Sequence, residues 1–232
     1  DSSAKACDLA SELEQVYAAV GIHPHHVFEI LEKGTDIPVI LQEIEALLQN
    51  NKVVAIGEIG LDKHVYQQTK YESYVVSGAF IDLQITLFQK QLQIALEHDL
   101  AVIIHNREAS SELLEIMDNF WDERLSGNVV FHCCEANHDL LSFAKEKNIF
   151  IGVDGDVTYD PVKRSFIKDV PVELLVLETD SPFLAQIPNR GKKNEPSFIK
   201  HTATKLSEIK EISFEKLVFE TTKNFNKLFN FS

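Results

Sequence analysis

Cysteine is scarce in this sequence, and the few that occur do not suit a disulfide framework. There are three among 232 residues, Cys7, Cys133 and Cys134, and two of them are neighbours. An odd number in a chain of this size predicts free thiols and a reducing, cytoplasmic environment. Long apolar runs are also missing, since none approaches the roughly 18 residues of a membrane span, and the polar beginning DSSAKACDLA does not resemble a signal peptide. We therefore expect no membrane partner.

Basic residues are few compared with acidic ones. Lysine and arginine number 22 against 36 aspartates and glutamates, and the net charge is −14. A protein that binds duplex nucleic acid by neutralising many phosphates needs the opposite balance, so the charge argues against broad duplex binding. A nuclease is not excluded, because bound metal ions supply local positive charge whatever the surface carries.

The remaining composition is that of an ordinary globular protein, with 44% hydrophobic and 25% charged residues. Internal repeats, low-complexity tracts and linker-like boundaries are absent from the sequence, so we expect one domain over residues 1–232. The longest irregular segment is QIPNRGKKNEP (186–196), which indicates a functional or capping loop. No obligate protein partner is evident.

Six short apolar runs rich in Val and Ile predict strands that are buried on both faces of a parallel sheet. They are VYAAVG (16–21), VVAIGEIG (53–60), AVIIH (101–105), NVVFH (128–132), IFIGV (149–153) and ELLVLETD (173–180). Helical spacing of apolar residues occurs between and after them, in 80–98, 110–125, 137–147, 196–209 and 214–229. The alternation predicts an α/β fold. A closed barrel needs eight strands, so either two weak strands escape the pattern or the chain starts part-way into the fold.

A titratable side chain follows the apolar part of five of these runs. VYAAVGI is followed by His23, VVAIG by Glu58, AVII by His105, NVVF by His132 and LLVLET by Asp180. Because the carboxyl ends of parallel strands meet on one face, we expect these side chains to converge although they are far apart in the sequence. Imidazoles and carboxylates without thiolates suit one or two divalent ions of Zn, Mn or Mg. Asp180 has the chemistry to bind metal and to take a proton from an attacking water.

Each of these residues also has a structural interpretation. A single histidine after a strand is commonly a core or capping residue, Glu58 suits the first turn of a helix, and Asp180 suits a helix N-cap before Pro182. Four such coincidences at strand ends are less probable than a site. Other candidates weigh less: Cys133 and Cys134 as structural filler, His25 and His26 as surface or capping residues, Asp154 and Asp156 as a solvated turn, and Arg190, Lys192 and Lys193 as a solvated loop or a phosphate contact.

Several motifs resemble the TatD family of metal-dependent deoxyribonucleases. In chain order they are GIHPHH (21–26), VVAIGEIGLD (53–62), QKQLQIALEHDLAVIIHNREA (89–109), VVFHCCEAN (129–137), ETDSPFL (178–184) and RGKKNEP (190–196). The resemblance implies a TIM-type (β/α)₈ barrel and metal-dependent hydrolysis of DNA, often from the 3′ end, with single-stranded or end-bound DNA as substrate. It also implies that Glu58, His105, His132 and Asp180 bind metal, and that His23, Arg107 and Arg190 lie near the substrate.

The sequence departs from the family in two places. The first strand, helix and second strand of the family, with the His-x-His pair that many members carry, have no counterpart here, so the barrel is expected to be N-terminally truncated. After His132 the sequence has CCEAN in place of an aromatic and small polar residues, and Glu135 adds negative charge. The alternatives to a deoxyribonuclease are a hydrolase of another ester or amide and a non-catalytic remnant of the barrel.

Overall fold

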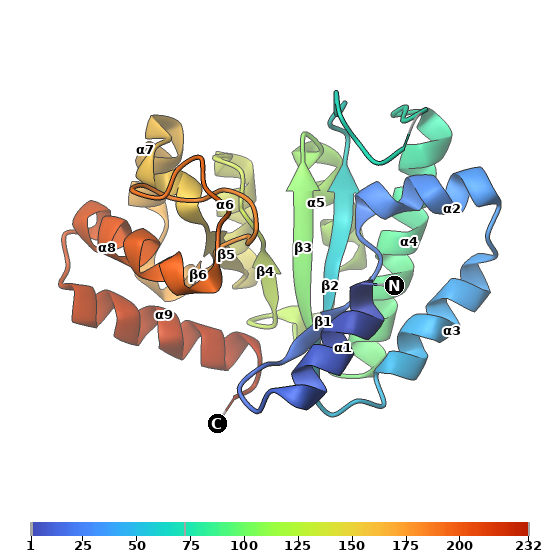
Figure 1. Ribbon diagram of the computed structural model, residues 1–232, viewed down its shortest axis with the longest axis horizontal. Coiled ribbons are helices and arrows are strands. Elements are labelled where there is room, and N and C mark those ends of the chain that lie inside the picture. The colour runs from blue at the N-terminus through green and yellow to red at the C-terminus, as the bar shows by residue number, and fades with distance from the viewer. Residues whose placement is uncertain (1, 72, 232) are drawn as a thin grey trace. The chain divides into compact units, whose positions relative to one another are not determined.

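The computed structural model describes residues 2–71 and 73–231 (Figure 1). Its contacts divide the chain into two portions, Asp1–Leu125 and Ser126–Ser232, which we call the N-terminal and C-terminal portions and describe one at a time. That the chain is a single domain stays a prediction. Within the described ranges, no helix has the length and apolar character needed to cross a bilayer.

The N-terminal portion is built on three parallel strands with β2 between β1 and β3. Helix α4 packs along β2, and both α2 and α3 contact α4 (Figure 1). In chain order the elements are α1 (Ser2–Glu12), β1 (Ala18–Val20), η1 (Pro24–His26), α2 (Val27–Lys33), α3 (Ile37–Leu47), β2 (Val53–Asp62), α4 (Gly78–Glu97), β3 (Ala101–Arg107), α5 (Ser110–Phe120) and η2 (Glu123–Leu125).

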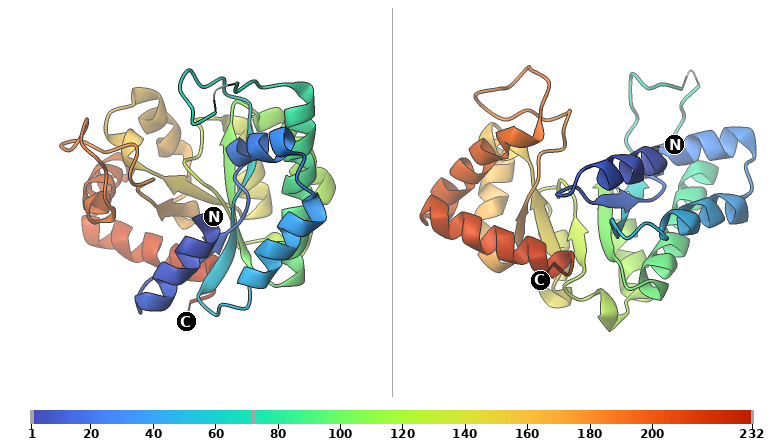
Figure 2. Two further views of the ribbon diagram at one scale, coloured as in Figure 1. Left: turned by 45° about the vertical axis from the view of Figure 1, so that its right-hand side comes forward. Right: turned by 60° about the horizontal axis from the view of Figure 1, so that its bottom comes forward.

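The C-terminal portion also contains three parallel strands, with β5 between β4 and β6. Helix α9 contacts β6, and α8 and α9 run side by side in both views of Figure 2. The elements are β4 (Val129–Phe131), α6 (His138–Lys147), β5 (Phe150–Val153), η3 (Gly155–Thr158), α7 (Pro161–Asp169), η4 (Val172–Leu174), β6 (Leu175–Leu177), η5 (Pro196–Phe198), α8 (Ile199–Lys210) and α9 (Phe214–Leu228).

All six predicted strands and all five predicted helices are present, with some differences in their bounds. The helix expected over 110–125 ends at Phe120, and the one expected from 196 begins at Ile199 after a turn of 3₁₀ helix. Strands β2 and β3 continue to Asp62 and Arg107, so Glu58 and His105 lie inside strands instead of after them. Helices α1, α2, α3 and α7 were not predicted.

Two buried glutamines on α4 hold the ends of the first two strands. The Gln91 side chain accepts a hydrogen bond from the Ile22 backbone nitrogen at 2.6 Å and donates to the Ile22 carbonyl oxygen. Gln84 does the same for Asp62, accepting from its nitrogen at 2.9 Å and donating to its oxygen at 3.0 Å, and it also donates to the Pro24 carbonyl oxygen. Both glutamines are 1% exposed. These bonds satisfy backbone groups that would otherwise be buried without partners as each strand ends.

A β-bulge in β2 sets the position of Glu58. Gly57 pairs with Ile103 and Ile59 pairs with Ile104, so Glu58 is an extra residue in the ladder. Bulges redirect side chains and are common beside functional sites. Gly60, shortly after the bulge, has φ +141°, and a Cβ at this position would lie 2.0 Å from the carbonyl oxygen of His105. Only glycine therefore allows β2 and β3 to approach this closely.

We predict that Gly60→Ala lowers the free energy of unfolding by about 3 kcal/mol or more, because the new methyl group meets rigid backbone. Gly78→Ala is the matched control: it lies in the first turn of α4 with no atom within 4 Å of its Cβ position, and it should be neutral or stabilising by up to about 1 kcal/mol. Urea unfolding followed by circular dichroism measures both. Equal unfolding midpoints for the two variants would contradict the close approach.

Candidate functional site

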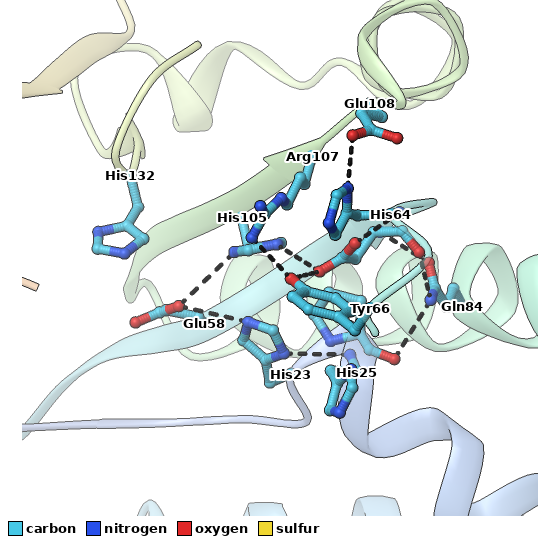
Figure 3. Close-up of polar contacts among 12 residues, drawn as sticks. His23, His25, Glu58, His64, Tyr66, Gln84, His105, Arg107, Glu108 and His132 are labelled. Carbon is cyan, nitrogen blue, oxygen red and sulfur yellow. Dashed lines mark hydrogen bonds and ion pairs between the residues drawn. The ribbon is translucent and has the colours of Figure 1, made fainter. Parts of the chain in front are cut away.

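Three side chains from three successive strand regions form the first group of potential metal ligands. His23 is the N-cap of η1 just beyond β1, Glu58 lies in the bulge of β2, and His105 lies in β3. The Glu58 carboxylate is 3.6 Å from Nε2 of His23 and 3.9 Å from Nδ1 of His105 (Figure 3). One ligand atom from each of the three lies within 4.8 Å of the others. Two imidazoles and a carboxylate at this spacing fit a divalent transition-metal ion.

Asp62 lies behind His105 and fixes its ring. Its Oδ2 is 3.2 Å from Nε2 of His105 and accepts a hydrogen bond from the Tyr66 hydroxyl at 2.7 Å, while Oδ1 accepts from the His64 backbone nitrogen. Burial alone would raise the pKa of Asp62, but the hydrogen bonds from His105 and Tyr66 lower it below its usual value. Since an ionised carboxylate only accepts, Nε2 of His105 carries the proton and Nδ1 presents its lone pair toward Glu58.

Arg107 is connected to the same group through Tyr66. Its Nη1 donates to the Tyr66 hydroxyl oxygen at 3.0 Å, and its guanidinium carbon lies 4.9 Å from the centre of the Tyr66 ring (Figure 3). The Tyr66 hydroxyl in turn donates a hydrogen bond to Asp62, so a chain of hydrogen bonds runs from the exposed Arg107 to His105, a potential metal ligand. The guanidinium is thereby held at the surface, where an anionic substrate group can reach it.

His25, expected to be a surface or capping residue, is half-buried and lies among aromatic rings. Its ring centre is 5.1 Å from that of Tyr66 and 4.8 Å from that of Tyr74. Its backbone nitrogen donates to Nδ1 of His23 at 3.1 Å, which orients the His23 ring. Burial, together with repulsion from His105 and His26, lowers the pKa of His23 to about 2. His23 is therefore neutral, and because its Nδ1 accepts the hydrogen bond from His25, the ring proton lies on Nε2, which faces Glu58.

The second group of potential ligands lies in the C-terminal portion, around His132, which directly follows β4. Nδ1 of His132 contacts the Glu178 carboxylate, and Nε2 is 3.7 Å from Oδ1 of Asp180. The other oxygen of Glu178 accepts a hydrogen bond from the Cys133 backbone nitrogen at 2.6 Å. Glu178 thus stands behind His132 as Asp62 stands behind His105, and Nε2 of His132 faces Asp180. His132, Cys133 and Glu178 also have ligand atoms within 4.8 Å of one another.

Behind Cys133 is a buried group of charges that the sequence did not predict. Asp154 is fully buried and Lys163 is 3% exposed, and the Lys163 ammonium lies 3.4 Å from the Asp156 carboxylate and donates to the Cys134 carbonyl oxygen. The expectation of a solvated turn at Asp154 and Asp156 is therefore wrong. The sequence does carry a signal for this helix, because Phe166, Ile167 and Val170 have helical spacing and Lys163 falls on the same face. All four residues are buried, so the lysine lies on the apolar side of α7.

Arg190 lies on the loop after β6, with its guanidinium carbon 3.5 Å from the centre of the Tyr159 ring.

The thiols of Cys133 and Cys134 are unreactive. Burial raises the pKa of both, that of Cys134 to about 12. This agrees with a structural role for Cys133 and Cys134, and all three cysteines are free.

The structure brings the predicted residues together within each portion. His23, Glu58 and His105 meet in the N-terminal portion, and His132 and Asp180 meet in the C-terminal portion. The interpretation of Glu58 as an acid in the first turn of a helix is wrong, since it lies in a strand. Asp62 and Glu178 were not predicted as site residues, although both belong to motifs quoted above, because spacing does not reveal a carboxylate that stands behind another side chain.

The carboxyl groups of Asp154 and Asp156 generate a prediction about pH. Burial raises the pKa of Asp156 to about 8; the positive charge of Lys163 lowers it and the negative charge of Asp154 raises it further. Between its ordinary pKa of 3.8 and 8, the folded protein thus holds a proton that the unfolded chain has released, so stability falls as pH rises. Asp156→Asn should remove this dependence, and its melting-temperature advantage over wild type should grow from pH 5 to pH 8 and then level off.

Thermal unfolding in the presence of EDTA measures this difference without interference from metal ions. Asp139→Asn, at an exposed position of α6, is the control for the loss of one negative charge. A melting-temperature difference between Asp156→Asn and wild type that stays constant from pH 5 to pH 9 would contradict the prediction.

Comparison with known proteins agrees with this geometry. Residues 1–230 match the family model described as TatD related DNase. The chain is 34% identical over 227 residues to the uncharacterized metal-dependent hydrolase YabD of Bacillus subtilis, covering 97% of this chain and 82% of that protein.

Solved structures extend the comparison to the fold. The crystal structure of YjjV, a TatD homologue from Escherichia coli, superimposes with a TM-score of 0.81 at 27% identity, over 98% of this chain and 82% of that one. A TatD family hydrolase from Entamoeba histolytica has the same fold, with a TM-score of 0.76 at 22% identity over 99% and 80% of the two chains. The predicted α/β class of the TIM-barrel type is confirmed. The chain belongs to the TatD family of metal-dependent hydrolases.

Proposed function

We propose that this protein is a deoxyribonuclease that hydrolyses phosphodiester bonds of single-stranded or end-bound DNA with the help of one or two divalent metal ions. The observation that carries the proposal is the pairing of imidazole and carboxylate in the ligand groups, with a further carboxylate behind each of His105 and His132. This is the arrangement by which proteins orient metal-binding histidines. The family model, described as TatD related DNase, supports DNA as the substrate.

In this proposal Glu58 and His105 bind metal in the N-terminal portion, and His132 and Asp180 bind metal in the C-terminal portion. Zn, Mn and Mg all accept such ligands. When bound, a divalent ion polarises the phosphate and lowers the pKa of water toward neutrality. The remaining chemistry falls to the side chains of the chain itself.

Asp180 is the residue best suited to accept a proton from the attacking water. It follows β6, and His132 faces it at 3.7 Å. Its side chain is 27% exposed, so water has access to the carboxylate. Glu178 holds His132 from the other side and keeps the imidazole directed at Asp180. A solvent-accessible carboxylate beside a proposed metal ligand has the chemistry that general-base catalysis requires.

Contacts with the DNA are assigned to His23, Arg107 and Arg190. Arg107 is held at the surface by Tyr66, and Arg190 is held by Tyr159. Both guanidiniums retain N–H groups that match phosphate oxygens. Few phosphate contacts suit a chain with a net charge of −14, which favours an end or a single strand over an extended duplex.

We predict that Asp180→Asn reduces kcat on a short single-stranded oligonucleotide by about a hundredfold or more, because the amide cannot accept the proton. Hydrolysis is followed by gel electrophoresis with Mg²⁺, Mn²⁺ or Zn²⁺ added in turn. Asp169→Asn, at an exposed position at the end of α7, is the control. An unchanged rate for Asp180→Asn would refute its role, and wild-type activity on p-nitrophenyl acetate without activity on DNA would favour the alternative of another ester substrate.

A second prediction concerns metal affinity and is independent of the substrate. Asp62→Asn removes the charge that orients His105, and the dissociation constant of Mn²⁺ measured by calorimetry should rise about tenfold to a hundredfold. Tyr66→Phe keeps the contact between Asp62 and His105 and should have a smaller effect. His105→Ala should lower the metal occupancy and reduce the thermal stabilisation that added metal gives, since the group around His132 remains intact. The role of Asp62 would be excluded by wild-type metal affinity in Asp62→Asn.

A further inference from the structure

The loop that follows Asp180 exposes apolar side chains that are close to one another in the sequence. Phe183 is 68% exposed, Ile187 is 52% exposed and Leu184 is 38% exposed. Isolated apolar residues on a surface need no explanation, but three within five positions of one loop form a patch. We call Phe183 and Ile187, together with Arg190 on the Tyr159 ring, the loop platform.

Buried amides hold this loop in place. The Asn194 side chain is 3% exposed and donates to the carbonyl oxygens of Thr179 and Phe183, each at 2.6 Å. Gln186 is fully buried and donates to the Phe198 carbonyl oxygen at 2.7 Å. Ile187 is tied to η3 through a bond from its nitrogen to the Thr158 hydroxyl. The exposure of Phe183 is therefore fixed by the backbone around it and does not result from a loose loop.

The platform begins at the proposed general base. The Phe183 backbone nitrogen donates to the Asp180 carbonyl oxygen at 2.7 Å, so the two residues share one turn. Asn194 binds the carbonyl oxygen of Thr179 immediately before it. Phe183 therefore lies within one turn of the chain from Asp180.

The charge of the platform differs from that of the whole chain. Arg190, Lys192 and Lys193 are exposed on one short segment of a protein whose net charge is −14. The Arg190 guanidinium lies over Tyr159, with its carbon 3.5 Å from the ring centre. Stacking restricts the guanidinium while leaving its N–H edge available for an anion. An exposed aromatic ring and cationic side chains on one loop match a single-stranded nucleic acid, which offers base faces and phosphates in alternation.

We infer that the loop platform binds the nucleotide next to the cleaved bond, with its base stacked on Phe183 and a neighbouring phosphate bound by Arg190. The inference rests on the proposed deoxyribonuclease function and deepens it. Single-stranded DNA is the form that fits, because a base in a duplex is stacked between its neighbours and cannot offer its face to a protein ring. Phe183 then acts in substrate binding and takes no part in the chemical step.

The test removes the base and the ring separately. Wild type, Phe183→Ala and Arg190→Ala are assayed on a single-stranded oligonucleotide and on two versions in which the two terminal nucleotides, at the 3′ or the 5′ end, carry a tetrahydrofuran in place of the base. Phe219→Ala is the matched control, because Phe219 on α9 is 66% exposed. For wild type, KM should rise about tenfold when the stacked base is missing.

Phe183→Ala should show this raised KM on the natural oligonucleotide and no further rise on the abasic one, with kcat unchanged. Arg190→Ala should weaken binding of both substrates equally, since both keep their phosphates. Phe219→Ala should behave as wild type. The inference is overturned if Phe183→Ala keeps the preference for the base, or if its effect is no larger than that of Phe219→Ala.

A binding measurement separates this inference from the proposed function. Fluorescence anisotropy with a labelled oligonucleotide and the Asp180→Asn protein reports binding without cleavage. The double variant Asp180→Asn, Phe183→Ala should bind the oligonucleotide about tenfold more weakly. If wild type cleaves DNA but Phe183→Ala binds as tightly as its control, the platform fails and the nuclease stands. If wild type neither binds nor cleaves DNA, both the platform and the proposed function fail.

Discussion

The geometry of the N-terminal ligand group depends on two glutamines that are buried against the strand ends. Gln91 and Gln84 of α4 bind the backbone of Ile22 and Asp62 with both ends of their amides. A buried amide left unpaired costs about 1–3 kcal/mol, so these bonds fix the depth and rotation of α4 against the sheet. His23 follows Ile22 and the His105 ring rests on Asp62. The ligand positions are thereby tied to helix packing.

A common arrangement supports the two histidines that lie in different portions of the chain. His105 has Asp62 behind it and His132 has Glu178 behind it. In each case the carboxylate holds one ring nitrogen and leaves the other directed at a carboxylate, Glu58 or Asp180. The rings are oriented before any ion binds, which reduces the reorganisation that binding requires.

Much of this could be predicted from the sequence, and the parts that could not have physical reasons. Runs of Val and Ile revealed all six strands because parallel strands are buried on both faces. The bulge at Glu58 could not be predicted, since one extra residue in a strand leaves the composition unchanged. Helix α7 was missed because Lys163 interrupts its apolar face. The positions of the strands identified the candidate ligands. The supporting roles of Asp62 and Glu178 became evident only from the structure.

The bonds made by Asn194 and Gln186 have a consequence for how the loop after β6 tolerates change. Most surface loops accept insertions because their backbone is bonded to water. Here side-chain amides span the segment from Thr179 to Phe198, so its length is set by fixed points at both ends. Adding or removing a residue would break the hydrogen bonds of these amides and leave the backbone carbonyl groups that they bind without partners. Selection for a stable fold would then preserve the length of this segment even in relatives that bind a different substrate.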